Sequence, residues 1–477
     1  MIKRNEFNRI NHLCCCGTTV LSFIIALMLT ESVSAQSFTT LPMIAVGGGH
    51  SVALKSDGTV WAWGLNVWGQ LGDGTTTNHR TPVQVSGLTR VTAIAAGMSH
   101  TVALKSDGTV WAWGANSFGQ LGNGTTTNSR VPVKVSGLSD VSSIAVGEVH
   151  NIVLKKDGTV WTWGSNSCGE LGNGTEGLLS NKTTPIQVPN LTDVLAIAAG
   201  GAHSVVLKNN GKVWAWGMNY YRQLGDGTYI DRSTPIQVQN LNDVSAITAG
   251  SKHTVAQKSD GTVWAWGDNS NRQLGDGSTT ERRTLVQVFG LSNITSISAG
   301  EDHTVALKQD GTAWAWGSHW GGTESDNGSP AQIIGLSIVT SIASGKYTNT
   351  LAVKSDGTVW AWGSNNYGQL GDETLTVSYR PIQVLGTNGV GYLNLGSIQS
   401  FIPEINKENE KQLTAYSNNG VVYISGLKIG LSLIVYNING MITYKGIATE
   451  EKMEVQMLGR GMYIVTNGKN TVKILDK

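Results

Sequence analysis

The chain repeats one pattern of apolar and polar positions about every 50 residues. In the second unit, the runs at residues 94–96, 100–105, 110–114 and 133–135 are rich in apolar and β-branched residues, and turn-forming residues separate them. The pair Asp107-Gly108 between the two middle runs indicates a hairpin, because glycine readily adopts the positive φ that a tight turn requires. Each unit is therefore predicted to form about four short antiparallel strands.

The tetrapeptide Trp-x-Trp-Gly marks the repeat and occurs seven times, at intervals of 46 to 53 residues. An insertion around residues 176–180 explains the longest interval, and a short divergent loop at residues 319–330 explains the shortest. Seven such units predict a seven-bladed β-propeller over residues 36–400. Because one blade cannot bury both of its faces, we expect the indole rings to fill the gaps between blades. This structural motif comprises Trp61, Trp63, Trp111, Trp113, Trp161, Trp163, Trp214, Trp216, Trp264, Trp266, Trp314, Trp316, Trp360 and Trp362.

The two ends of the chain carry different patterns. Lys3 and Arg4, an apolar run at residues 20–29 and the small residues after it predict a signal peptide over residues 1–35, cleaved between Ala35 and Gln36. That run is too short to span a bilayer, so no transmembrane segment is expected in the mature chain. Beyond a polar linker at 401–412, six short β runs predict a small C-terminal β-sandwich at residues 413–477. The predicted fold class is all-β.

Composition narrows the possible functions. The formal net charge is +1, and residues 1–35 carry three basic and two acidic side chains, so their removal leaves a neutral chain. A neutral protein is a poor ligand for a phosphate backbone, and we expect no nucleic-acid partner. Cys168 is the single cysteine beyond the signal segment, so the mature fold is predicted to form no internal disulfide. We found no cofactor motif, and no cofactor is expected.

The repeated sequence His-x-x-x-Leu-x-x-Asp-Gly-x-Val-Trp-x-Trp-Gly, followed by Gly-Gln-Leu-Gly, resembles the regulator of chromosome condensation repeat family over residues 40 to about 395. The resemblance implies a seven-bladed propeller. The founding member is a nucleotide exchange factor for a small nuclear GTPase, but here an export signal stands in place of a basic nuclear tail. Another relative is a secreted bacterial inhibitor of β-lactamases, which grips its partner with loops on one propeller face.

The C-terminal segments 433–440, 458–465 and 472–477 look like a type IX secretion sorting domain. This resemblance implies recognition by the outer-membrane secretion machinery and, usually, removal of the domain. The opening Pro-Asn-Pro that such domains often have is absent, and residues 415–420 stand in its place. Together with the signal peptide, this segment predicts a protein that is secreted or held at the outer cell surface.

Two side chains recur at fixed distances before the first motif tryptophan. Six histidines could suggest a metal site, but one position repeated around a propeller spreads over separate blades and cannot converge on one ion. We therefore expect a structural role for these histidines and no metal. Seven lysines are expected to solvate or pair at blade edges. The histidines are His50, His100, His150, His203, His253 and His303, and the lysines are Lys55, Lys105, Lys155, Lys208, Lys258, Lys308 and Lys354.

Positions that differ between repeats are better candidates for recognition, because variation on a fixed frame is typical of binding loops. The residue seven places after the first motif tryptophan is aromatic in four repeats, and arginine or tryptophan lies beside it in three. Aromatic and arginine side chains suit an interface hot spot. The alternative is that they only pack the loop after each Trp-Gly. These candidate binding residues are Trp68, Phe118, Tyr221, Arg222, Arg272, Trp320 and Tyr367.

The leading hypothesis is a secreted or cell-surface propeller that acts as a non-catalytic scaffold for an unknown extracellular protein or glycan. One alternative is a secreted hydrolase or lyase with its active site in the central channel, for which the sequence offers only carboxylates outside the repeat pattern. A less favoured alternative is guanine nucleotide exchange, by analogy with the family. The carboxylates are Glu148, Asp268, Glu301 and Asp302. No catalytic residue is assigned.

Overall fold

The computed structural model describes residues 38–318, 328–345 and 349–396, together with seven strands between residues 414 and 476. The predicted signal peptide, its cleavage site and the predicted linker lie outside the described residues. None of the described residues belongs to a helix that is long and apolar enough to cross a membrane.

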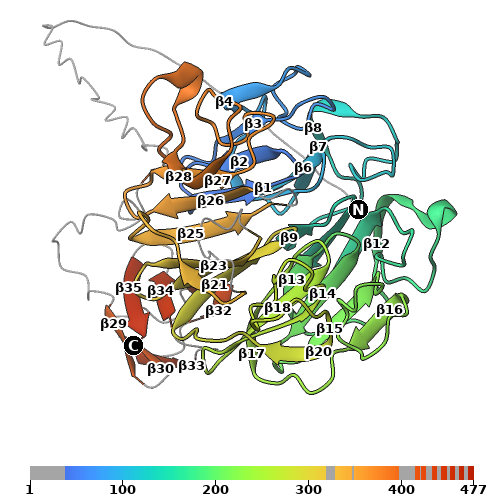
Figure 1. Cartoon of the computed structure of the whole chain (residues 1–477), viewed down its shortest axis with the longest axis vertical. Helices are drawn as coiled ribbons and strands as arrows, with labels where there is room; N and C mark the ends of the chain where they lie inside the picture. The colour runs from blue at the N-terminus through green and yellow to red at the C-terminus, as the bar shows by residue number, and fades with distance from the viewer. Residues whose placement is uncertain are drawn as a thin grey trace, which may run out of the picture. The chain divides into compact units, whose positions relative to one another are not determined.

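Seven four-stranded antiparallel sheets follow one another along the chain, and each sheet is built from four consecutive strands (Figure 1). The first four sheets comprise β1 (Met43–Val46), β2 (His50–Leu54), β3 (Val60–Gly64), β4 (His79–Gln84), β5 (Val91–Ala96), β6 (His100–Lys105), β7 (Val110–Gly114), β8 (Ser129–Lys134), β9 (Val141–Val146), β10 (His150–Lys155), β11 (Val160–Gly164), β12 (Lys182–Gln187), β13 (Val194–Ala199), β14 (His203–Lys208), β15 (Val213–Gly217) and β16 (Arg232–Gln237). The last three comprise β17 (Val244–Ala249), β18 (His253–Lys258), β19 (Val263–Gly267), β20 (Arg282–Gln287), β21 (Ile294–Ala299), β22 (His303–Lys308), β23 (Ala313–Gly317), β24 (Ala331–Gln332), β25 (Val339–Ser344), β26 (Asn349–Lys354), β27 (Val359–Gly363) and β28 (Ser378–Gln383). This arrangement confirms the predicted seven-bladed propeller.

The central hairpin of each blade forms where the sequence predicts it. In the second blade β6 and β7 have the predicted bounds, while β5 and β8 begin three to four residues earlier than predicted. Gly108 in the connecting turn has φ 78°, and Asp107 Oδ1 accepts hydrogen bonds from the backbone N–H and the hydroxyl of Thr109, at 3.0 and 2.6 Å. The side chain of Asp107 thus completes the turn that Gly108 makes possible.

The core of the propeller lies between the blades. The second tryptophan of the motif is fully buried, as with Trp113, which packs with Leu54 and Leu71 of the preceding blade. Its Nε1 donates to the carbonyl of Gln70 in that blade at 2.9 Å. The first tryptophan, such as Trp111, is only half-buried and packs against the edge of the same cluster. The prediction that indole rings fill the gaps is therefore confirmed, and the second ring of each pair is the deeper one.

The recurring lysines pair with the first tryptophan of their own blade. The ammonium groups lie 3.9 to 5.6 Å from the ring centroids in all seven blades, with Lys308 and Trp314 closest. This is a cation–π arrangement, which stabilises a partly exposed indole at the cost of little desolvation of the ammonium group.

The first strand of each blade contacts the first strands of both neighbouring blades, so these seven strands line the central channel. The ring closes between blades one and seven, where Trp63 Nε1 donates to the carbonyl of Gln369 at 2.9 Å and β1 lies next to β25 (Figure 1). The backbone of Leu395 then bonds to Gly357 of blade seven at 2.9 Å and to Ser56 of blade one at 2.8 Å. Residues 392–396 thus take the place of the linker that joins consecutive blades elsewhere.

Two short 3-10 helices, η1 (Leu178–Ser180) and η3 (Thr387–Gly389), lie in loops, the first of them in the predicted insertion. The C-terminal region forms two sheets, one of three and one of four strands. Six of its strands correspond to predicted β runs, and β29 is additional. The strands are β29 (Thr414–Asn418), β30 (Val421–Ser425), β31 (Ser432–Asn437), β32 (Ile442–Ile447), β33 (Lys452–Gln456), β34 (Gly461–Thr466) and β35 (Thr471–Asp476). The packing of these sheets as a sandwich stays a prediction.

Candidate functional site

The two ends of each blade differ in what they expose. Because the strands alternate in direction, the Gly-x-x-His turn before the second strand and the long loop after Trp-Gly lie at the same end of every blade. We call this end of the propeller the loop face. The Asp-Gly turns and the linkers between blades lie at the other end, which we call the hairpin face. The predicted binding residues that the structure describes all belong to loops of the loop face.

A ring of backbone hydrogen bonds joins the Gly-x-x-His turns. The N–H of Met98 donates to the carbonyl of Glu148 at 3.0 Å, and the N–H of Glu148 donates to Gly201 at 3.0 Å. Comparable links run from the N–H of Ser251 to the carbonyl of Gly300 and from the N–H of Glu301 to that of Gly345, each at 3.1 Å, with the first glycine of the next turn as the acceptor. The backbone is thus held at the two variable positions of each turn, while their side chains are free to differ between blades.

The histidines form a second, buried ring beneath these turns. Each Nε2 lies 2.8 to 3.1 Å from a hydroxyl or amide oxygen in the next blade. The hydroxyl of Thr101, the partner of His50, donates its own hydrogen to the carbonyl of Gln70 at 2.9 Å. It therefore accepts a hydrogen bond from the N–H of His50 Nε2. The six pairs are His50–Thr101, His100–Asn151, His150–Ser204, His203–Thr254, His253–Thr304 and His303–Thr350.

This arrangement explains the glycine that precedes each histidine. A β-carbon built on Gly97 would lie 2.3 Å from Cε1 of His100 and 2.8 Å from the carbonyl of Gly147, so no other residue fits beneath the ring. Full burial lowers the pKa of His50 to about 3 and that of His100 to about 4, and both imidazoles are therefore neutral near pH 7. Each of the six histidines lies in a different blade and bonds to the next one, which supports the predicted structural role.

Four carboxylates that depart from the repeat pattern gather on one side of the loop face. The pKa of Glu301 is raised to about 7, mainly by burial and then by the charge of Asp302, with a smaller contribution from Glu148, while Lys252 opposes the shift. Burial also raises the pKa of Asp302, which interacts with Lys252 and Asp268. The structure therefore brings each carboxylate that the sequence offered for catalysis within electrostatic reach of at least one other. Lys252, which sequence reasoning did not single out, interacts with Glu301 and Asp302.

Lys252 also connects this cluster to an aromatic residue of the predicted binding site. Its Nζ lies 4.8 Å from the ring centroid of Tyr221, and Tyr221 meets the exposed Tyr220 edge to face at 5.1 Å between centroids. Lys252 occupies a variable position of the Gly-x-x-His turn, as do Glu148, Glu301 and Asp302. Comparison of these turn positions between repeats would have identified Lys252 from the sequence.

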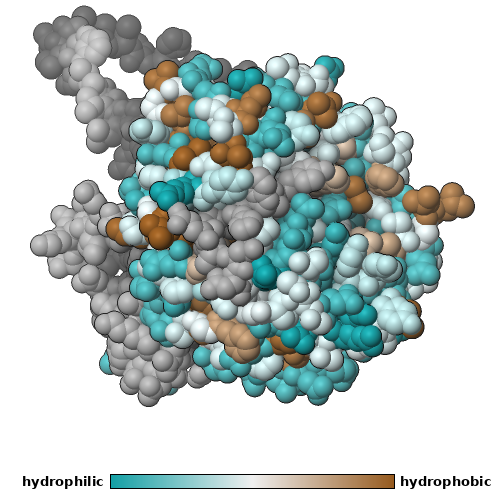
Figure 2. Space-filling model, in the orientation of Figure 1, coloured by the Kyte–Doolittle hydropathy of each residue, from teal (hydrophilic) through white to brown (hydrophobic). Residues whose placement is uncertain are grey.

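The predicted aromatic residues occupy corresponding places, each in the loop after Trp-Gly. Trp68 and Tyr367 are exposed, at 48% and 39%, while Phe118 and Tyr221 are half-buried. The ring of Tyr367 packs against the Gly-x-x-His turn of blade one at Gly49, as Tyr221 packs near the turn of blade five. These side chains thus surround the ring of turns. On the side of the molecule shown in Figure 2, hydrophobic residues form small separate patches among hydrophilic ones.

The arginines contribute differently from what the sequence suggests. Arg222 adopts φ 64° at a position where four other blades have glycine, and its guanidinium forms an ion pair with Glu281 of the next blade. Arg272 has φ 63° at the equivalent position. A β-carbon built on Gly69, at that position in blade one, would point at Arg130 in the outer strand of the next blade, so this position faces outward between blades. Trp320 lies outside the described residues.

Cys168 occupies the same loop position as the aromatics in blade three. Burial, followed by the charge of Glu170, raises the pKa of the thiol to about 11. Among the described residues it is a free cysteine, as predicted. Its thiol is therefore protonated and unreactive near neutral pH.

Known proteins share this architecture. Residues 24–327 match the RCC1-like domain, and residues 339–369 and 356–399 match the regulator of chromosome condensation (RCC1) repeat. The solved structure of Prp20p from Saccharomyces cerevisiae, described with its binding to Gsp1p and histones, is 25% identical, with a TM-score of 0.61 over 69% of this chain and 86% of that one. Human WBSCR16 is 23% identical, with a TM-score of 0.62 over 69% of this chain and 94% of that one. With its seven blades and a match that spans more than half of its length, the chain belongs to the RCC1-like domain family.

Proposed function

We propose that this protein is an exported, non-catalytic scaffold that binds an extracellular protein or glycan through its loop face. One observation carries the proposal: side chains that differ from blade to blade stand on turns that backbone hydrogen bonds join, from each of the first six blades to the next. Such a frame can change its partner without changing its fold. The exposed rings of Trp68, Tyr220 and Tyr367 supply the apolar contacts that dominate interface energies.

Binding is tested with the purified protein on arrays of glycans and of extracellular proteins. The change W68A combined with Y367A is expected to weaken a saturable interaction at least tenfold, because each exposed ring is a candidate hot spot worth about 2 kcal/mol or more. The matched control is F289A combined with Y392A, which removes two aromatics of similar exposure, 59% and 60%, from the hairpin face. Equal losses in the two double variants, or the absence of any saturable partner, would contradict the proposal.

Export and sorting belong to the same proposal. The signal peptide pattern and the resemblance of residues 413–477 to a secretion sorting domain support a secreted or surface-held protein with no nucleic-acid partner. In this view the C-terminal sheets form a β-sandwich that the outer-membrane machinery reads. Mass spectrometry of the protein recovered from the native cell surface is expected to find Gln36 at the N-terminus and residues 413–477 removed. A full-length chain in the cytosol would contradict this part and would favour the exchange-factor alternative.

One observation favours a second candidate, a hydrolase or lyase. A carboxyl group with a pKa of about 7, as in Glu301, can exchange a proton near neutral pH, and Asp302 and Lys252 interact with it. Screening against glycoside and peptide substrates tests this candidate, with E301Q as the diagnostic variant. If E301Q abolishes a turnover that W68A leaves intact, the protein is an enzyme and the scaffold proposal fails.

A further inference from the structure

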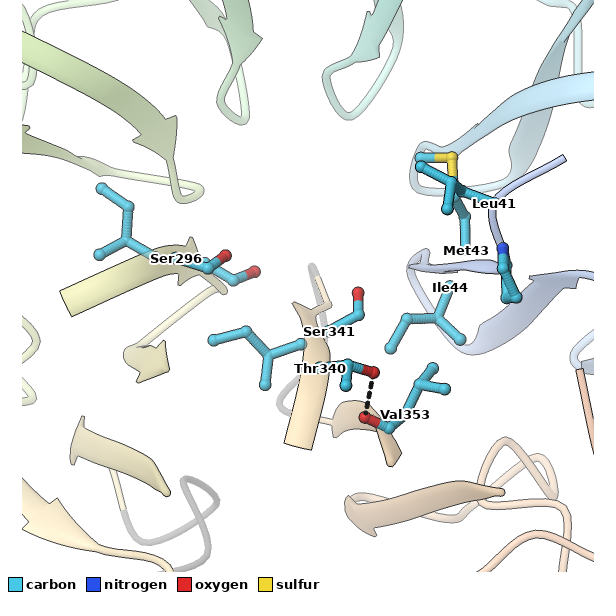
Figure 3. A pocket seen from close by; sticks show the side chains of 11 residues that line it. Leu41, Met43, Ile44, Ser296, Thr340, Ser341 and Val353 are labelled. Atoms are coloured by element: carbon cyan, nitrogen blue, oxygen red, sulfur yellow. Dashed lines mark hydrogen bonds between the residues drawn. The ribbon is translucent and has the colours of Figure 1, made fainter. Parts of the chain in front are cut away.

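The central channel contains a cavity that departs from the sevenfold repeat. It has a volume of about 210 Å³ and lies where β1, β21 and β25, the inner strands of blades one, six and seven, meet (Figure 3). Its lining comprises residues 41–42, the first two residues of β1, and residues within β21, β25 and β26, so it is separate from the turns of the loop face. The cavity is therefore distinct from the surface to which the proposed function is assigned.

Two hydroxyl groups face this cavity without a partner in the described part of the chain. Ser296 is only 6% exposed and Ser341 is half-buried, and neither hydroxyl forms a hydrogen bond to a described residue. Other hydroxyls of the lining are engaged: Thr340 donates to the carbonyl of Val353 at 3.1 Å, and Ser298 accepts from the N–H of Ser344 at 2.9 Å. Because both hydroxyls open onto the cavity, they are available to bond to a molecule held there.

The other blades provide an internal comparison. Ser296 and Ser341 each stand four residues before the glycine of the Gly-x-x-His turn. The equivalent residue is alanine in three blades, Met43 in blade one, and Ser143 in blade three, where both neighbouring blades have alanine. Two adjacent hydroxyls therefore occur only between blades six and seven. Figure 3 shows Ser296 and Ser341 on one side of the cavity, with Met43 and Ile44 bordering it from β1.

The lining determines which chemistry the cavity accepts. It contains no charged side chain, so an ionised ligand would lose its hydration without compensation. Leu41, Met43, Ile44 and Ile342 supply apolar contacts, while the two serines can each donate a hydrogen bond. A cavity of about 150 Å³ holds benzene, so this one has room for a six-membered ring with a small substituent. We propose that the channel cavity binds a small uncharged molecule with an apolar body and a carbonyl or hydroxyl oxygen.

The test uses the full chain labelled with ¹³C at the methionine methyl groups. The methyl signal of Met43 is assigned through M43L and followed while cyclohexanone is added. A saturable shift is expected for cyclohexanone, and no shift at the same concentrations for cyclohexanecarboxylate or cyclohexylammonium, which carry a charge on the same ring. S296A combined with S341A should weaken binding of cyclohexanone about tenfold, because two hydrogen bonds are lost.

The matched control is S143A, which removes a hydroxyl from the equivalent position of blade three and should leave binding unchanged. S341L, which fills the cavity, should abolish the shift while the remaining methyl signals keep their positions. The proposal is overturned if cyclohexanone gives no saturable shift, which would leave water as the partner of the serines. It is also overturned if the charged rings bind equally well, or if the double alanine variant binds as the native chain does.

Discussion

The buried histidine ring makes a specific prediction about Thr101. This residue connects two groups: its hydroxyl accepts from Nε2 of His50 at 3.0 Å and donates to the carbonyl of Gln70 at 2.9 Å. Replacing Thr101 by valine keeps the shape of the side chain and removes only the hydroxyl. The carbonyl of Gln70 still accepts from Nε1 of Trp113, but the N–H of His50 loses its acceptor inside the protein.

The expected cost follows from that orphaned donor. Leaving a buried N–H without a partner costs about 1–3 kcal/mol, and both residues are completely buried, so water cannot replace the hydroxyl. Serine at the same position retains the hydroxyl and loses one methyl group, at a cost of about 1 kcal/mol. The chain itself uses serine at the equivalent Ser51 and Ser204. We therefore expect T101V to destabilise the propeller by about 2–3 kcal/mol and T101S by about 1 kcal/mol.

Urea unfolding at pH 8, followed by tryptophan fluorescence, compares the two variants with the native chain under conditions in which the histidines are neutral. A lower midpoint for T101V than for T101S, with unchanged slopes, is the expected result. If T101V proved as stable as T101S, the hydrogen bond between His50 and Thr101 would contribute nothing to stability, and the histidine ring would not stabilise the contacts between blades.

Further predictions concern the same ring and the partly buried thiol of Cys168. G97A should destabilise by more than about 3 kcal/mol, because its β-carbon would overlap the ring of His100, whereas G137A, with φ 70° and open space around it, should cost about 1 kcal/mol in urea unfolding. The free energy of unfolding should be highest above pH 6.5, the pKa of histidine in the unfolded chain. It should fall as the pH drops toward 4, because the unfolded histidines then bind protons that the folded state excludes. Burial lowers the pKa of three histidines, His50, His100 and His303. Together they should make the free energy of unfolding change by about 4 kcal/mol per pH unit in urea titrations, and a flat profile would refute their burial as neutral groups. Cys168 should resist alkylation by iodoacetamide at pH 8 in the folded chain and react readily in urea, because its pKa is about 11; equal rates would contradict this.

The sequence alone predicted the features that repeat. Strand runs, tight hairpin turns and paired indoles occur in every unit. A residue type that recurs from unit to unit indicates that the blade structure needs it at that position. For the same reason the structural role of the histidines could be predicted, but not their partner, because the hydrogen bond of His50 reaches 51 residues along the chain to the next blade. The closing segment at 392–396 could not be predicted, since it carries none of the repeat sequence and acts through its backbone.

The candidate site could be predicted only in part, because its members come from loops whose geometry is not encoded by periodicity. Spacing placed Trp68 and Tyr367 in corresponding loops, and the structure leaves both exposed. The same reasoning grouped Arg222 with the aromatics, but a left-handed backbone turns its side chain outward to Glu281. Proximity in sequence is therefore a poor guide to proximity on this face, where successive residues of a tight turn point in different directions.

The physical basis for variation on this scaffold is the separation between what holds the blades and what they display. Hydrogen bonds between turns use backbone groups, and the bonds below them use buried side chains such as His100 and Asn151. Neither set involves the side chain at the first variable position of the turn, so glycine at Gly48, methionine at Met98 and glutamate at Glu148 all occupy the same frame. A charge can therefore be introduced at one blade without loss of closure at the next. The carboxylate cluster and the exposed aromatics are thus independent additions to one ring, and under the proposed function their combination determines which partner binds.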